Sequence, residues 1–199
     1  MKKRIFTLLS FSLLVLLTGC MGIPLSSLPR LVKLPEQLLT LKPAEFMLAI
    51  QTDSRMLPPA GASPTLDITI QPKNVGDYAP VDKKIPMQLA ELQGVALGLE
   101  RATSGRRWLI YSFPAASQAE LAAIQTTFKR IKAENDAKGS KGDGSLTVGI
   151  AQQNIATADA ALDNTRWESW LQTSAKDGFF ELWSGTVKDI KVQAKKAAK

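Results

Sequence analysis

Short apolar runs separated by turn residues fill much of the chain, and this pattern favours strands over long helices. Residues 46–52 are expected to form one strand, which ends in the proline-rich stretch 57–64. Leu66, Ile68 and Ile70 then alternate with polar residues, as in a strand that has one face in the core. Because the two strands follow one another, we expect them to pair as a hairpin.

Further strands are expected in the middle of the chain. The strongest candidate covers residues 108–113, which are mainly aromatic and aliphatic and are stopped by Pro114. Weaker candidates cover residues 84–92 and 97–100, and strand character returns at 146–150. These segments indicate a sheet-rich domain.

One substantial helix is expected over residues 117–138. Ser117 has the character of an N-cap, and Glu120 stands three residues later, as in a capping box. Apolar residues then recur at helical spacing and form one face of the helix. They are Leu121, Ile124, Phe128 and Ile131.

The C-terminal part fits more than one element. Residues 166–173 fit either a helix face or a strand with a bulge, and we favour the strand. Asp177 and Gly178 form a turn signal before a strand at 179–183. Residues 186–190 are expected to form a final strand. Strands on both sides of one helix predict an α+β fold, built on an antiparallel sheet or a small β-sandwich.

Residues 1–19 are typical of a signal peptide. Lys2, Lys3 and Arg4 make the start positive, and residues 5–17 are mostly apolar. The segment is short and closes on small residues, which distinguishes it from a membrane-spanning helix.

The leader ends in Leu17-Thr18-Gly19-Cys20, which closely resembles the lipobox of bacterial lipoproteins. The resemblance implies that Cys20 becomes the first residue of the mature protein and carries lipid on its thiol and its new amino terminus. Several acyl chains anchor a protein firmly, because each buried methylene contributes about 0.8 kcal/mol. The membrane is thus the first expected partner.

The whole chain resembles proteobacterial envelope lipoproteins of uncharacterised function. In such lipoproteins an aspartate after the cysteine favours the inner membrane, whereas this chain has Met21 there. The resemblance implies an outer-membrane protein that faces the periplasm. A Gram-positive cell surface stays an alternative.

Four segments are expected along the chain: a signal peptide at 1–19, a lipidated tether at 20–43, a single α+β domain at 44–190 and a basic tail at 191–199. The prolines of the tether are expected to interrupt any long helix. Its leucines either pack against the domain or lie on the membrane surface as an amphipathic segment.

Two absences exclude much common chemistry. The chain has no histidine, and its one cysteine is Cys20. This excludes histidine-dependent triads, histidine or thiolate metal sites and an internal disulfide. We expect no cofactor and no metal. The formal charge is +7, and it decreases when Lys2, Lys3 and Arg4 are removed with the leader. The mature protein is then only mildly basic, which does not favour nucleic acid as a partner.

Two groups of side chains are candidates for ligand binding. Trp167, Trp170 and Trp183 gather aromatic surface near the C-terminal end, which fits either core packing or an exposed recognition surface. Three arginines flank an expected turn at residues 104 and 105 and fit either a solvated loop or a contact with anionic lipid or glycan. They are Arg101, Arg106 and Arg107.

Nothing in the sequence indicates catalysis. The glycine-rich run 139–144 lacks P-loop spacing and indicates a flexible loop. The carboxylates show no pairing, and no Ser-x-x-Lys motif is found near Ser145. We therefore expect a non-catalytic protein that binds an envelope protein, a glycan or a lipid.

Two alternatives follow from the tail and the acidic residues. The tail ends at Lys199 and resembles, over its last residues, the abundant outer-membrane lipoprotein whose terminal lysine is joined to peptidoglycan. A structural tether to peptidoglycan is the first alternative. The second is a cell-wall hydrolase that would use two of the carboxylates Glu100, Glu120, Asp163, Glu168, Asp177 and Glu181.

Overall fold

The structure is a computed structural model, and it describes residues 22–74, 77–91, 96–137, 144–152, 154–156 and 160–197. The predicted signal peptide and Cys20 lie outside the described residues, as do the last two residues of the tail. Most of the glycine-rich run also lies outside them, and its last residue, Gly144, begins a strand.

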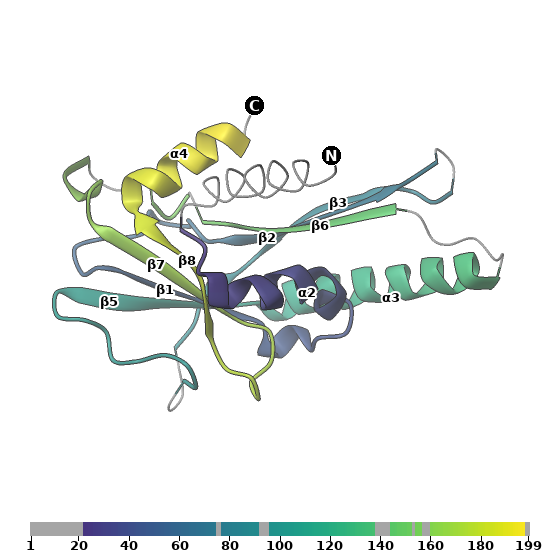
Figure 1. Cartoon of the computed structure of the whole chain (residues 1–199), viewed down its shortest axis with the longest axis horizontal. Coiled ribbons are helices and arrows are strands. Elements are labelled where there is room, and N and C mark those ends of the chain that lie inside the picture. The colour runs from purple at the N-terminus through teal and green to yellow at the C-terminus, as the bar shows by residue number, and fades with distance from the viewer. Residues whose placement is uncertain are drawn as a thin grey trace, which may run out of the picture.

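Eight strands form two antiparallel sheets in the described part of the chain (Figure 1). One sheet has five strands in the order β4-β5-β1-β7-β8, and the other has three in the order β3-β2-β6. The strands are β1 (Met47–Asp53), β2 (Thr65–Pro72), β3 (Val81–Pro86), β4 (Gln88–Leu89), β5 (Arg106–Ser112), β6 (Gly144–Ala151), β7 (Arg166–Gln172) and β8 (Phe180–Thr186). The α+β fold is confirmed.

Within the described ranges, three α-helices accompany the sheets: α2 (Leu28–Leu38), α3 (Ala115–Ala137) and α4 (Val187–Ala197). Short 3-10 turns lie at Leu25–Ser27, Pro43–Glu45 and Ala160–Leu162. Figure 1 shows α3 running beside the three-stranded sheet. Leu48 of β1, Leu66 of β2 and Leu121 of α3 are fully buried in one apolar cluster, so both sheets and the long helix share a single core.

The predicted hairpin between the first two strands is wrong. The alternation in β2 is correct, since Leu66, Ile68 and Ile70 are all buried. However, β1 pairs with β5 on one side and β7 on the other, whereas β2 pairs with β3 and β6. The proline-rich loop carries the chain from one sheet to the other, so consecutive strands do not become neighbours.

The long helix is confirmed, but its predicted start is wrong. The carbonyl of Pro114 accepts the N–H of Gln118 at 2.9 Å, so α3 begins at Ala115. The Ser117 hydroxyl instead donates to the Pro86 carbonyl at 2.7 Å. Glu120 pairs with Lys83 of β3 at 3.1 Å. Both predicted capping residues thus attach α3 to the three-stranded sheet. The predicted apolar face is correct.

Two weaker strand predictions are corrected in part. Residues 84–92 split into the end of β3 and the two-residue strand β4. Residues 97–100 form a turn and no strand, because Gly98 has φ +87 and the Leu97 carbonyl accepts the N–H of Phe179 at 2.8 Å. This hydrogen bond attaches the loop before β5 to the loop before β8.

The favoured strand at 166–173 is confirmed as β7, and its pairing with β8 contains the register shift of a bulge between Ser169 and Trp170. The final strand predicted at 186–190 is wrong, because α4 begins at Val187. Thr186 and Asp189 form a capping box: the Asp189 carboxylate accepts the Thr186 N–H at 2.9 Å, and the Thr186 hydroxyl accepts the Asp189 N–H at 3.3 Å. The first part of the predicted tail is therefore helical.

The prolines of the predicted tether do not prevent a helix there. Pro29 lies in the first turn of α2, where a missing N–H costs nothing, and Pro35 lies inside the helix. Leu34 and Leu38 of this helix are buried in the core. The segment after Cys20 is thus built into the domain through its leucines.

We predict that Thr186→Ala lowers the free energy of unfolding by about 1 kcal/mol, because it removes the N-cap of α4. Urea denaturation measures the change. Thr126→Ala is the matched control, since the Thr126 hydroxyl only donates to the Ala122 carbonyl on the exposed side of α3. Equal losses in the two variants would show that the capping box does not stabilise the helix.

Candidate binding site beside helix α2

The segment before α2 is attached to the edge strand β8. The Gly22 carbonyl accepts the N–H of Ser184 at 2.7 Å. Gly22 has φ +109, and a Cβ there would lie 2.2 Å from Nε1 of Trp183. Only glycine fits this close approach without strain. The described chain therefore begins at the β8 edge of the sheet.

The other end of α2 is attached to α3. The side-chain amide of Gln125 donates to the Leu38 carbonyl at 2.7 Å and to the Leu41 carbonyl at 3.0 Å. Carbonyls at the end of a helix have no partner within the helix, so a buried amide that binds them satisfies them. These two attachments fix α2 across the space between β8 and α3.

Helix α2 presents one face to the domain and one to solvent. Leu34 and Leu38 are buried, and Leu31 and Leu39 are partly buried beside them. Val32, on the opposite face, is 78% exposed. The spacing of the four leucines is that of a helix face, and it is the signal in the sequence that could have predicted this element.

A cavity of about 450 Å³ lies on one side of α2. Its wall combines the chain before α2, the edge strand β6, and β8 with α4. The lining is mainly apolar, with Asp67 and Gln152 as polar side chains among the residues described. The apolar side chains are Ile23, Leu31, Leu34, Pro35, Val148, Ile150, Ala151, Leu182, Trp183 and Ile190.

A second cavity, of about 670 Å³, lies between α2, α3 and β6. Its apolar lining consists of Pro35, Leu39, Ile70, Phe128, Ile131 and Leu146. Its polar lining consists of Glu36, Thr40, Tyr78, Lys129, Lys132 and Ser145. Both volumes lie within the range of about 300–1,000 Å³ that is typical of small-molecule sites.

Pro35 lines both cavities. It has no N–H to donate to the carbonyl of Leu31, one helical turn earlier, so the helix lacks one hydrogen bond where the cavities meet. The arrangement therefore offers two adjoining apolar spaces beneath one helix.

The three predicted tryptophans do not form one surface. Trp167 is fully buried, and its Nε1 donates to Gln152 at 3.1 Å. Trp183 is also buried and lines the first cavity. Trp170 is partly buried on the opposite face of the sheet, where its ring packs edge-on against Trp108 with centroids 4.9 Å apart. Only Trp183 thus belongs to the candidate site.

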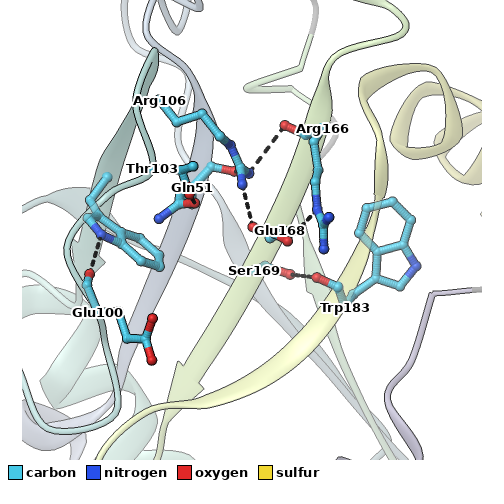
Figure 2. Close-up of polar contacts among 9 residues, drawn as sticks. Gln51, Glu100, Thr103, Arg106, Arg166, Glu168, Ser169 and Trp183 are labelled. Atoms are coloured by element: carbon cyan, nitrogen blue, oxygen red, sulfur yellow. Dashed lines mark hydrogen bonds and ion pairs between the residues drawn. The ribbon is translucent and has the colours of Figure 1, made fainter.

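The predicted arginines are also separated. Arg106 donates to Glu168 at 2.5 Å and to the Gln51 carbonyl at 2.6 Å (Figure 2). Glu168 is buried, and its second oxygen pairs with Arg166. This cluster connects β5, β1 and β7 and leaves Arg106 engaged inside the fold.

The two other arginines have different surroundings. Arg107 donates to the carbonyl of Met56. Arg101 is exposed on the loop before β5. Neither residue lines the cavities beside α2 in the part of the chain that is described. The three arginines therefore do not form a joint binding surface.

The predicted carboxylates lie apart from the cavities. Glu120 pairs with a lysine of β3, and Asp163 pairs with Lys191 of α4 at 2.5 Å. Glu168 belongs to the cluster around Arg106. Among the described lining residues each cavity has a single carboxylate, Asp67 or Glu36. The described residues also contain no group of three side chains suited to hold a metal ion.

The chain was compared with known proteins. No protein-family model matches it, and neither the curated proteins nor the solved structures gave a significant match. Within the described ranges, every helix is too short or too polar to cross a bilayer.

We predict that Gly22→Ala loosens the segment before α2, because the methyl group would clash with Trp183 and the backbone at this φ is strained. Faster trypsin cleavage at Arg30 measures this. Gly61→Ala is the control, since Gly61 also has positive φ, at +76, but nothing lies within 4 Å of its Cβ position. Unchanged cleavage in Gly22→Ala would contradict the attachment to β8.

Proposed function

We propose that this protein is a non-catalytic, lipid-anchored module of the outer membrane that faces the periplasm and binds an apolar envelope ligand beside α2. The observation that carries the proposal is the pair of apolar cavities that meet at Pro35. The predicted leader and lipobox support the location.

The position of the predicted anchor supports a ligand from the membrane. Ile23 lines the first cavity and follows Cys20 by three residues. An extended chain spans at most about 3.6 Å per residue, so the anchor and this wall lie within roughly 11 Å of each other. A lipidated Cys20 would thus hold the cavity close to the bilayer surface.

The composition of the lining favours a lipid over a glycan. Buried sugar hydroxyls need hydrogen-bond partners, because an unpaired polar group in an apolar site is costly. The first cavity has mostly aliphatic side chains and few polar ones among its described residues. An aliphatic chain has no hydrogen bonds to lose on entering such a space, and it gains about 0.8 kcal/mol for each buried methylene.

The anchor is tested by intact mass. We predict that the purified wild-type chain lacks residues 1–19 and carries acyl groups at Cys20, whereas Cys20→Ser keeps the leader and is unmodified. Met21→Ala is the control and should be processed as the wild type is. An unmodified cysteine in the wild-type protein would refute the anchor and leave the cavities to be tested alone.

The site is tested by filling it. We predict that Leu31→Trp, in the first cavity, and Leu39→Trp, in the second, lower the affinity for hexadecanol about tenfold or more, because the larger ring occupies the space of the chain. Native mass spectrometry of the full chain, released from a steroid-based detergent too bulky for the cavities, counts the bound alcohol.

Val32→Trp is the matched control, because Val32 lies on the exposed face of the same helix. It should bind hexadecanol as the wild type does. Thermal unfolding of each variant verifies that the fold survives. Equal binding by all three variants, or no binding by the wild type, would refute the proposed site.

A further inference from the structure

The second cavity differs from the first in its charge. Lys129 and Lys132 line it from α3, together with the apolar Phe128 and Ile131. Residues three apart on a helix lie on the same side, so both lysines, which are exposed, lie at the rim of the cavity on one side of α3.

Neither lysine is paired with a carboxylate among the described residues, although such pairs occur nearby. Arg130, between them in the sequence, pairs with Glu134 at 3.1 Å on another side of α3. The described lining contains one carboxylate, Glu36 of α2, against the two lysines. The rim therefore has an excess of positive charge, which complements an anion.

Tyr78 and Gly144 also line the second cavity. The Tyr78 hydroxyl donates to the Gln71 carbonyl at 2.9 Å. A Cβ at Gly144 would lie 2.1 Å from this hydroxyl oxygen, so the tyrosine packs tightly on the start of β6. From there the apolar lining leads past Leu146 and Leu39 to Pro35, where the first cavity begins.

We infer that the ligand is an acyl-chain amphiphile with an anionic head group, held with its head at Lys129 and Lys132 and its chain along the apolar wall toward Pro35. This inference rests on the proposed function, since it names the class of ligand for the same site. Lysine can bind either head group, because its flexible side chain allows the ammonium group to reach a carboxylate or a phosphate.

Three probes with a 16-carbon chain test the inference: palmitate, hexadecanol and 1-palmitoyl-lysophosphatidylglycerol. The full chain is measured by native mass spectrometry from the steroid-based detergent. We expect at least one of the two anions to bind about tenfold more tightly than hexadecanol, as charge-assisted hydrogen bonds imply. A preference for palmitate assigns a fatty acid, and a preference for the lysophospholipid assigns a phospholipid source.

The double variant Lys129→Gln with Lys132→Gln should lose this preference, so that the anions bind it no more tightly than hexadecanol does. Arg130→Gln is the matched control on the same helix and should keep the preference. All three positions are exposed, so the variants should unfold at the wild-type temperature.

Two outcomes separate this inference from the function on which it rests. Equal affinity of the wild type for the anions and for hexadecanol, or a preference that survives in the double variant, overturns the anionic head group and leaves the apolar site intact. Failure of every probe to bind overturns the proposed function itself.

Discussion

The burial of Leu34 and Leu38 holds α2 on the domain, and both cavities depend on this contact. Each buried leucine contributes roughly 1.5–3 kcal/mol. Gln125 and the Gly22–Ser184 hydrogen bond then fix the two ends of the segment. Without α2, the side of β6 that the helix contacts would lie open to solvent. One helix thus completes the core and creates the space beside it.

On the opposite side of the five-stranded sheet, a largely buried ion pair connects its central strands. Arg106 of β5 contacts Glu168 of β7 across β1, and Trp108 and Trp170 pack together on the same face. A buried pair of this kind contributes little net stability, but the loss of one partner leaves an uncompensated charge. The cluster therefore favours the pairing register of β5, β1 and β7 that brings Arg106 next to Glu168. These two polar residues thus have a structural role.

The proposed anchor and the proposed ligand are consistent with each other. A lipid on Cys20 would lie next to the wall that contains Ile23, and an anionic amphiphile would have its head at the lysines of α3. The two ideas are nevertheless independent in their tests. The anchor depends on the leader and one cysteine, whereas the binding site depends on side chains of α2, α3 and β6.

The sequence by itself determined the elements whose signal is local. The alternation in β2 and the apolar face of α3 follow from side-chain period, and the strand in β5 follows from its run of aromatic and aliphatic residues. Together they predicted the α+β fold. Only the tertiary structure decided which strands pair, because a proline-rich loop sends β1 and β2 into different sheets. It also decided that Val187 and Ile190 lie in a helix, because the short run 186–190 fits the period of a strand as well as that of a helix. The cavities beside α2 were beyond prediction for the same reason: their walls come from segments far apart in the chain, and only packing brings those segments together.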